Sequence, residues 1–189
     1  MQEEITRGED GKRSNITIVE LEKWINHYVS LERELISENS TDGFPIALST
    51  QIVQLISIWD FHIDGYKFFP VTDISEVKRG KTERLFQEIM EKEGYFQDSS
   101  SLVQEDLTSW GTVFSYFQKK QYIIIVENEK NGDFYIGKVH SSDDHGCVMS
   151  CFDVLGVWDE ETSEIKYDDI TCLTFGDRYS EMMTKYVIE

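Results

Sequence analysis

Short runs of apolar, often β-branched residues recur along the chain between polar turns, and they predict a fold rich in short β-strands. The Asn131-Gly132 pair lies between two such runs and is a hairpin signal, because both residue types tolerate the positive φ of a tight turn. Five strands are predicted in the second half of the chain, over 122–126, 134–139, 147–152, 165–167 and 170–175. The third of these can extend past Gly156 to Trp158. Closing five short strands into a small barrel removes exposed sheet edges, so the pattern favours a barrel.

The first half shows a similar series of strands after an amphipathic start. Ile18 and Leu21 fall at helical spacing, with Asn15 or Thr17 available as the N-cap. The apolar pattern that follows fits two interpretations: one long helix, or a short helix followed by a strand over residues 26–34. Further strands are predicted over 44–48, 52–59, 66–71 and 74–78.

Three more helices are predicted from apolar residues that recur every three or four positions. The first follows Gly80 with Thr82 as its N-cap, the second carries a stripe that faces the core, and the third begins after Asp177. In that order, the apolar positions are Leu85, Phe86, Ile89 and Met90; Val103, Leu107, Trp110, Phe114 and Phe117; and Tyr179, Met182, Met183 and Tyr186.

A repeat relates the two halves of the chain. The run Asp73-Ile74-Ser75 matches Asp169-Ile170-Thr171, and Gly80 matches Gly176, with one constant offset of 96 residues. The match predicts a duplicated unit of helix, five strands and helix. It divides the chain into a disordered leader over 1–14, a diverged first copy over 15–96 and a second copy over 97–189, with a Ser-rich linker at 98–101. Pairing of the two copies within one chain makes an obligate ring of subunits unnecessary.

The second copy also carries two motifs of a known family. Gly132, Gly137 and Asp143 stand at the spacing of the first Sm signature. The run Ile-Lys-Tyr-Asp-Asp-Ile over 165–170 falls where the second signature, Ile-Arg-Gly-Asp-Asn-Ile, is expected. Residues 121–176 therefore resemble an Sm-like (LSm) barrel, which implies an N-terminal helix and five strongly bent strands. Together with the repeat, this predicts an α+β fold of two tandem Sm-like or SH3-like five-stranded β-barrels with flanking helices.

The same resemblance implies RNA binding, but the positions that read RNA in the family have changed. The family uses a Met-Asn pair after the signature Asp and the Arg of the second signature. Here Gly146 and Cys147 take the place of the Met-Asn pair, and Lys166 takes the place of the Arg. The side-chain amide that reads a base edge is therefore missing. An RNA-binding alternative would depend on His145 and Lys166, joined by the basic cluster Lys78, Arg79 and Lys81. That cluster is also explained as a solvated turn before a helix, where a phosphate or acidic side chain could dock.

Composition narrows the choice of partner. The 189 residues carry a formal net charge of −18, and acidic residues outnumber basic ones on both sides of Phe96. Such a surface repels nucleic acid and favours basic protein partners. The sequence has no apolar run of the roughly 20 residues that a membrane span needs. Three cysteines without a secretory signal predict free thiols and a cytoplasmic location.

No motif predicts a catalytic residue, a metal site or a cofactor. His145, Cys147 and Cys151 form a His-x-Cys-x-x-x-Cys run beside Asp143 and Asp144, but the second pair of ligands that zinc sites normally use is absent. Buried structural thiols are the preferred explanation. The acidic clusters lack a calcium-binding loop, and no glycine-rich phosphate loop is present.

The sequence therefore predicts a non-catalytic, cytoplasmic protein-interaction module without a cofactor. Two alternatives stay open: a degenerate Sm-like RNA-binding protein, and an acidic immunity-type inhibitor that masks a basic toxin or nuclease. A hydrolase is a third, weaker alternative. The oligomeric state is left open.

Overall fold

The computed structural model describes residues 16–95 and 106–187, so the predicted leader and the linker at 98–101 lie outside the described residues. The first half contains α1 (Ile18–Glu22), β1 (Val29–Glu32), β2 (Thr41–Leu48), β3 (Ile52–Trp59), β4 (His62–Pro70), β5 (Glu76–Lys78) and α2 (Lys81–Lys92). The second half contains α3 (Trp110–Lys120), β6 (Ile123–Asn128), β7 (Asp133–Ser142), β8 (Gly146–Cys151), β9 (Ser163–Lys166), β10 (Cys172–Phe175) and α4 (Arg178–Thr184).

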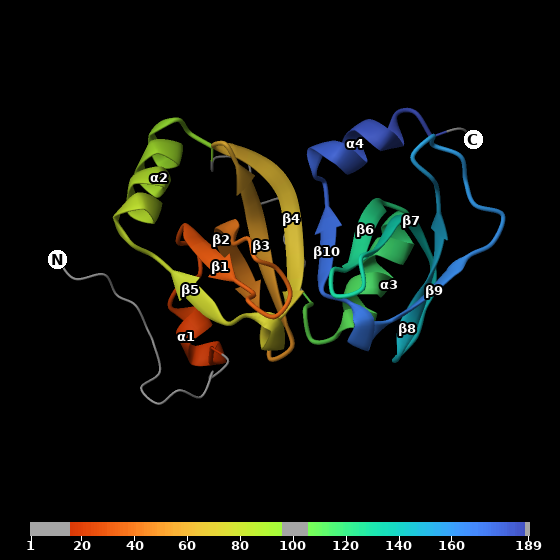
Figure 1. Ribbon diagram of the computed structural model, residues 1–189, viewed down its shortest axis with the longest axis horizontal. Helices are drawn as coiled ribbons and strands as arrows, with labels where there is room; N and C mark the ends of the chain where they lie inside the picture. The colour runs from red at the N-terminus through yellow and green to blue at the C-terminus, as the bar shows by residue number, and fades with distance from the viewer. Residues whose placement is uncertain (1–15, 96–105, 188–189) are drawn as a thin grey trace.

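These strands form one antiparallel sheet in the order β5-β1-β2-β3-β4-β10-β6-β7-β8-β9 (Figure 1). The two halves meet where β4 runs beside β10. In Figure 1, α2 lies beside the strands of the first half and α4 lies above those of the second. The largest core contains buried residues of both halves, a second lies in the first half together with Cys172 of β10, and a small third core lies in the second half.

The expected fold of two closed barrels is therefore wrong. A closed first barrel requires β4 to pair with β5, but β4 pairs with β10 of the second half. Within the described residues, β5 pairs only with β1 and β9 pairs only with β8, so both outer edges stay open. The strands were placed correctly in outline, and the mixture of helices and strands agrees with the α+β class.

The β4–β10 joint is apolar on one face, which explains why these edges prefer each other. Tyr66 faces Phe175, Lys67 faces Thr174 and Phe68 faces Leu173 across the joint. The Tyr66 and Phe175 rings are stacked with their centroids 6.4 Å apart. Phe68, which is 1% exposed, packs edge-on against Phe117 of α3. Burying this surface stabilises the open sheet by the ordinary hydrophobic effect.

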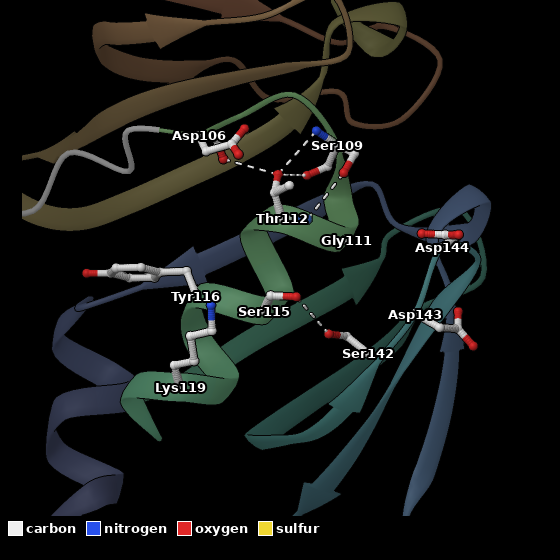
Figure 2. Close-up of a pocket in the computed structure, with 10 residues that line it drawn as sticks. All are labelled: Asp106, Ser109, Gly111, Thr112, Ser115, Tyr116, Lys119, Ser142, Asp143 and Asp144. Atoms are coloured by element: carbon white, nitrogen blue, oxygen red, sulfur yellow. Dashed lines mark hydrogen bonds between the residues drawn. The ribbon is translucent and has the colours of Figure 1, made fainter.

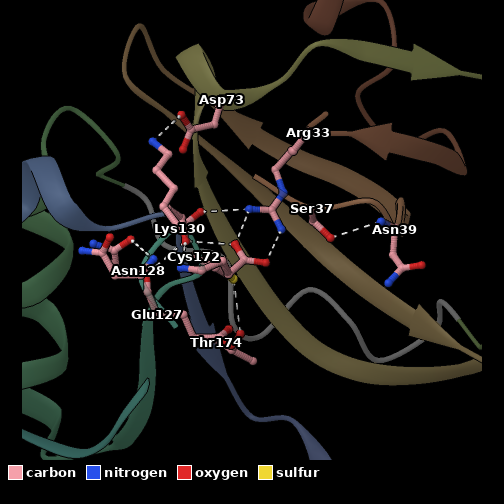
Figure 3. Close-up of polar contacts among 12 residues, drawn as sticks. Arg33, Ser37, Asn39, Asp73, Glu127, Asn128, Lys130, Cys172 and Thr174 are labelled. Atoms are coloured by element: carbon pink, nitrogen blue, oxygen red, sulfur yellow. Dashed lines mark hydrogen bonds and ion pairs between the residues drawn. The ribbon is translucent and has the colours of Figure 1, made fainter. Parts of the chain in front are cut away.

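A buried ion pair fastens the same joint (Figure 3). Arg33, at the end of β1, is 4% exposed and forms two hydrogen bonds to the Glu129 carboxylate, at 2.6 and 2.9 Å. Its guanidinium also donates to the Thr171 carbonyl oxygen at 3.2 Å and lies 4.3 Å from the centre of the Phe69 ring. The Thr171 hydroxyl donates to Glu129 at 2.9 Å. Arg33 therefore belongs to the first half but satisfies polar groups of the second.

The two halves place their strands in the same register. Gly43 of β2 faces Ser57 of β3, and Gly137 of β7 faces Cys151 of β8. Both hairpins contain a bulge, which falls between Pro45 and Ala47 in the first half. In the second half it falls between Val139 and Ser141, which are 94 residues further along in each case.

The structure explains why Gly137, one of the residues that carry the Sm resemblance, is a glycine. A Cβ at this position would lie 2.0 Å from the Ser150 carbonyl oxygen of the neighbouring strand. Gly43 has the same relation to the Ile56 carbonyl oxygen in the first half. Glycine is therefore required at both positions because two backbones approach closely.

The turns depart from expectation in two places. Only Gly132 of the Asn131-Gly132 pair has a positive φ, of 76°, because the β6–β7 connection is a four-residue loop. The tight two-residue turn with positive φ at both positions occurs instead at Asp60 and Phe61, between β3 and β4.

The helix boundaries follow the capping residues. Thr17 caps α1 in a capping box, and the strand alternative for the following segment is confirmed by β1. Gly80, rather than Thr82, is the N-cap of α2, and its N–H donates to the Glu83 carboxylate at 2.6 Å. Asp177 caps α4 as predicted. Val103 of the second predicted helix lies outside the described residues, and α3 starts at Trp110. The other residues of its stripe, Leu107, Trp110, Phe114 and Phe117, are buried as expected.

Candidate interaction surface

The β8–β9 connection holds an exposed apolar tip in a fixed conformation. Phe152 and Trp158 form a bridge at its base and their rings meet edge to face, with centroids 5.2 Å apart. Asp153 Oδ1 accepts hydrogen bonds from the backbone N–H groups of Leu155 and Val157, at 2.9 and 3.0 Å. Between these anchors, Val154 is 81% exposed and Leu155 is 75% exposed. The backbone hydrogen bonds thus fix a loop whose largest apolar side chains point into solvent.

Helix α4 extends this apolar surface. Tyr179 and Met182 are exposed three residues apart on α4, and Tyr186 is exposed just after the helix ends at Thr184; we call these three residues a stripe. Their neighbour Met183 packs inward against a small core instead. A Cβ at Gly156 would lie 3.0 Å from the Tyr186 carbonyl oxygen, so the loop sits against the carboxyl end of the stripe. We call the surface formed by Val154, Leu155, Val157, Tyr179, Met182 and Tyr186 the apolar ridge.

The clustering of these residues makes them informative. Single exposed apolar side chains are normal on protein surfaces, whereas contiguous groups mark interaction sites. Twelve large apolar residues are exposed in the described part of the chain, and seven of them lie between residues 134 and 186. Six of the seven form the apolar ridge, and the seventh, Phe134, has its ring 6.3 Å from that of Tyr179.

Acidic residues border the loop part of the ridge, whereas Arg178 and Lys185 are exposed beside its α4 part. Asp153 lies within the loop, and Asp159, Glu160 and Glu161 follow it directly, all of them exposed. No basic residue occurs between positions 153 and 163. A partner that covers the apolar tip would therefore meet carboxylates around it, which favours basic side chains at the rim of the contact.

A polar groove of about 750 Å³ lies between α3 and the β7–β8 turn (Figure 2). Its lining contains both hydroxyl groups and carboxylates, and Lys119 stands at one end. The hydroxyls serve the local structure: Ser109 caps α3, and Ser115 and Ser142 lie 3.3 Å apart. No histidine or cysteine belongs to this lining. Asp106, Asp143 and Asp144 give it an acidic character.

A second hollow, of about 600 Å³, contains two of the residues predicted for RNA binding. His145 and Lys166 both line it, and the His145 carbonyl oxygen accepts a hydrogen bond from the Tyr167 N–H at 3.0 Å. Asp143 Oδ1 accepts from the N–H groups of His145 and Gly146, at 2.7 and 3.0 Å. These backbone hydrogen bonds lower the pKa of Asp143, so the carboxylate stays charged. The donors that could hold a phosphate at this turn are thus already occupied by an acid.

The other three residues of the RNA hypothesis lie in the first half, on and after β5. Lys78 Nζ lies 2.7 Å from Glu32 and 3.9 Å from Glu76. Arg79 donates to the Tyr28 carbonyl oxygen at 2.6 Å, and Lys81 is the exposed first residue of α2. The structure therefore divides the five predicted residues between two places in the sheet, and brings only His145 and Lys166 together.

The cysteines are buried and free, as the sequence predicted. Burial raises the pKa of the Cys147 thiol to about 12 and that of Cys172 to about 11, so both stay protonated at neutral pH. Among residues 16–95 and 106–187, no group of three or more His, Cys, Asp or Glu residues is arranged to hold a metal ion.

The apolar ridge was not identified from the sequence. Residues 154–158 look like the continuation of an apolar strand, whereas they form the loop after β8. The sequence does contain a signal for a turn here, because Asp153 and Gly156 are turn-forming residues beside and within this apolar run.

Comparison with known proteins gives no relative: no family model matches the chain, and no curated protein or solved structure matches it. In the part of the chain that is described, none of the helices has the length and apolar character needed to cross a membrane.

Proposed function

We propose that this protein is a non-catalytic, cytoplasmic protein-interaction module that binds a basic partner through the apolar ridge. The observation that carries the proposal is the pair Val154 and Leu155, which are held almost fully exposed by an ordered loop. Solvent exposure of such side chains is unfavourable, and a partner that covers them gains the corresponding hydrophobic free energy. Three buried, unpaired thiols fit a reducing compartment.

Electrostatics supports a basic partner. The chain has a net charge of −18, and the ridge is followed by Asp159, Glu160 and Glu161. The acidic groove of Figure 2 lies in the same half of the molecule and adds carboxylates. A partner with apolar anchors and Lys or Arg around them would gain both hydrophobic contact and faster, charge-guided association. RNA is less well supported, because the hollow that contains His145 and Lys166 also contains Asp143 and Glu164.

A duplicated, Sm-like unit provides the scaffold in this proposal. The common strand order, the paired glycines and the bulges 94 residues apart support duplication. The turns before β3 and β8 support it further. Ser49 Oγ accepts from the N–H groups of Gln51 and Ile52, just as Asp143 Oδ1 accepts from His145 and Gly146. In this account the Sm signature residues Gly137 and Asp143 have structural roles in a hairpin, and the ridge is a separate binding surface.

A capture experiment with matched variants tests the proposal. Full-length protein is immobilised and exposed to nuclease-treated host lysate, and retained proteins are then purified and titrated directly. The Val154→Ser/Leu155→Ser variant removes the tip of the ridge. The Val19→Ser/Leu35→Ser variant is the control, because these side chains are similarly exposed, at 66% and 71%, in the other half.

We expect the ridge variant to weaken the dissociation constant of a basic partner at least about tenfold, while the control binds like the wild type. A partner that binds both variants equally would contradict the proposed surface. Retention that disappears after nuclease treatment would instead favour RNA-mediated capture.

A further inference from the structure

The polar groove between α3 and the β7–β8 turn has a rigid floor (Figure 2). The opposite face of α3 lies in the core, where Phe114 is fully buried. At Gly111 the helix approaches the turn so closely that a Cβ would lie 3.1 Å from the Asp143 carbonyl oxygen. Further along the helix, Gln118 Nε2 donates to the His140 carbonyl oxygen at 3.0 Å. A groove that is fixed in this way does not have to rearrange before binding, which lowers the free-energy cost of binding a ligand.

Charges of opposite sign stand at the two ends of the groove (Figure 2). Asp143 and Asp144 lie at the end that the β7–β8 turn forms, and Lys119 lies in the last turn of α3. Ser115 and Ser142, whose hydroxyl oxygens are 3.3 Å apart, lie between the two ends. All three charged side chains are exposed, so a ligand in the groove can contact each of them.

The ionised side chains of the groove accept more hydrogen bonds than they donate. Its three aspartates accept only, whereas Lys119 donates only. Hydrogen bonds from the turn backbone lower the pKa of Asp143, and those from Thr108 lower the pKa of Asp106, so both carboxylates stay charged. The Ser109 hydroxyl accepts one backbone N–H and keeps a second lone pair. A matching ligand must therefore bring N–H donors, and positive charge at the turn.

The length of the groove sets the spacing of the charges in such a ligand. Gly111, which touches the turn, and Lys119 are eight residues apart on α3, which corresponds to about 12 Å of helix. In an extended peptide, residues four positions apart point to the same side and lie roughly 13 Å apart. The groove volume of about 750 Å³ also falls within the range of roughly 300–1,000 Å³ that is typical of ligand pockets.

We propose that this groove binds an extended peptide segment of another protein, in which a Lys or Arg stands four residues from an Asp or Glu. The basic side chain pairs with Asp143 and Asp144, and the acidic one pairs with Lys119. Backbone N–H groups between them donate to the hydroxyls along α3. A nucleic acid would bring its phosphates against the carboxylates of the turn, which is unfavourable.

The groove is separate from the apolar ridge, so this proposal does not rest on the function proposed above. Helix α3 packs on the core that contains Val139 of β7, whereas Met183 of α4 packs on the core that contains Ile136. Positions 136 and 139 point to opposite faces of the strand. The β7–β8 turn and the ridge loop also lie at opposite ends of β8, whose six residues span roughly 20 Å.

Selection from a phage-displayed library of random heptapeptides, on immobilised full-length protein, tests the proposal. The wild type should enrich peptides with a basic and an acidic residue four positions apart, in one order along the peptide. The variant Lys119→Glu/Asp144→Lys exchanges the charges at the two ends of the groove, so it should enrich the opposite order. The control Lys23→Glu/Glu38→Lys exchanges two exposed charges in the first half and should enrich the same peptides as the wild type.

The peptide that the wild type enriches most is then synthesised and titrated. Its dissociation constant should rise at least about tenfold for the groove variant, because attraction becomes repulsion at both ends, and should stay unchanged for the control. Binding that the charge exchange leaves unchanged would overturn the proposal, as would a selection that enriches no charge pair. Peptides that lose binding only in Val154→Ser/Leu155→Ser belong to the ridge, and a selection that yields only these would support the ridge and refute the groove.

Discussion

The ion pair between Arg33 and Glu129 predicts a large loss of stability when only its acidic member is removed. In Glu129→Ala the guanidinium of Arg33, which is 4% exposed in the wild type, keeps its charge and loses both of its hydrogen bonds to the carboxylate. The Arg33 Nε atom is already buried without a partner, so the variant adds to an existing desolvation cost. Removing one member of a buried pair typically costs about 3–5 kcal/mol. Because Glu129 is 24% exposed, we expect a value near the lower end, about 3 kcal/mol.

Urea denaturation measures this change as a shift in the free energy of unfolding. Lys130→Ala is the control, because Lys130 pairs with Asp73 at 3.7 Å but is 50% exposed, and it should cost about 0.5 kcal/mol or less. Replacing both charges, in Arg33→Met/Glu129→Met, should recover part of the loss because no unpaired charge then stays buried. A loss below about 1 kcal/mol for Glu129→Ala would refute the reasoning.

The same pair predicts the direction of a pH dependence. Burial alone would raise the pKa of Glu129, but the hydrogen bond and charge of Arg33 outweigh it and lower this pKa. A lowered pKa in the folded state stabilises the protein above the pKa of the unfolded state, and this stability is lost as the pH falls through the folded-state value. Glu129→Gln should therefore flatten the acid limb of the stability curve. An acid limb identical to that of the wild type would contradict the assignment.

Three further predictions address local features. Gly137→Ala should lower the free energy of unfolding by roughly 3 kcal/mol, measured by thermal denaturation, because the new Cβ meets the Ser150 carbonyl oxygen. Gly132→Ala, whose Cβ would point into open space, should lower it by about 1 kcal/mol. Equal losses for the two variants would contradict the close approach of the backbones. Asp177→Ala should cost about 1 kcal/mol, measured in urea, through loss of the α4 cap, and no change would contradict the capping role. Cys147 should resist alkylation near neutral pH until the protein is unfolded, because burial raises its pKa; rapid labelling of the native protein, detected by mass spectrometry, would contradict this.

The elements could be predicted from the sequence where local signals agree. The helix at Ile18–Glu22 has its capping box within a few residues, and β3 is a mostly apolar run bounded by turn residues. The choice between helix and strand after α1 was resolved by β1, in agreement with the five strands per unit that the repeat predicts. These features depend on neighbours in the chain, so one sequence contains enough information to find them.

The joint between the halves could not be predicted in the same way. Strand β4 has an edge that could pair with β5 or with β10, and the apolar residues Tyr66 and Phe68 suit either partner. The preference for β10 depends on contacts made far along the chain, such as Phe68 with Phe117. The apolar ridge was missed for a related reason, because an apolar run such as 154–158 reads equally well as a buried strand or as an exposed loop.

The most direct test of this architecture is a measurement of which strand lies beside β4. In an isotope-labelled sample, nuclear Overhauser effects between backbone protons of adjacent strands report the partner. The account predicts cross-strand effects between Lys67 and Thr174 and between Phe68 and Leu173, as in one continuous sheet. Effects that join β4 to β5 in the same protein, with none to β10, would show two separately closed units and contradict the account.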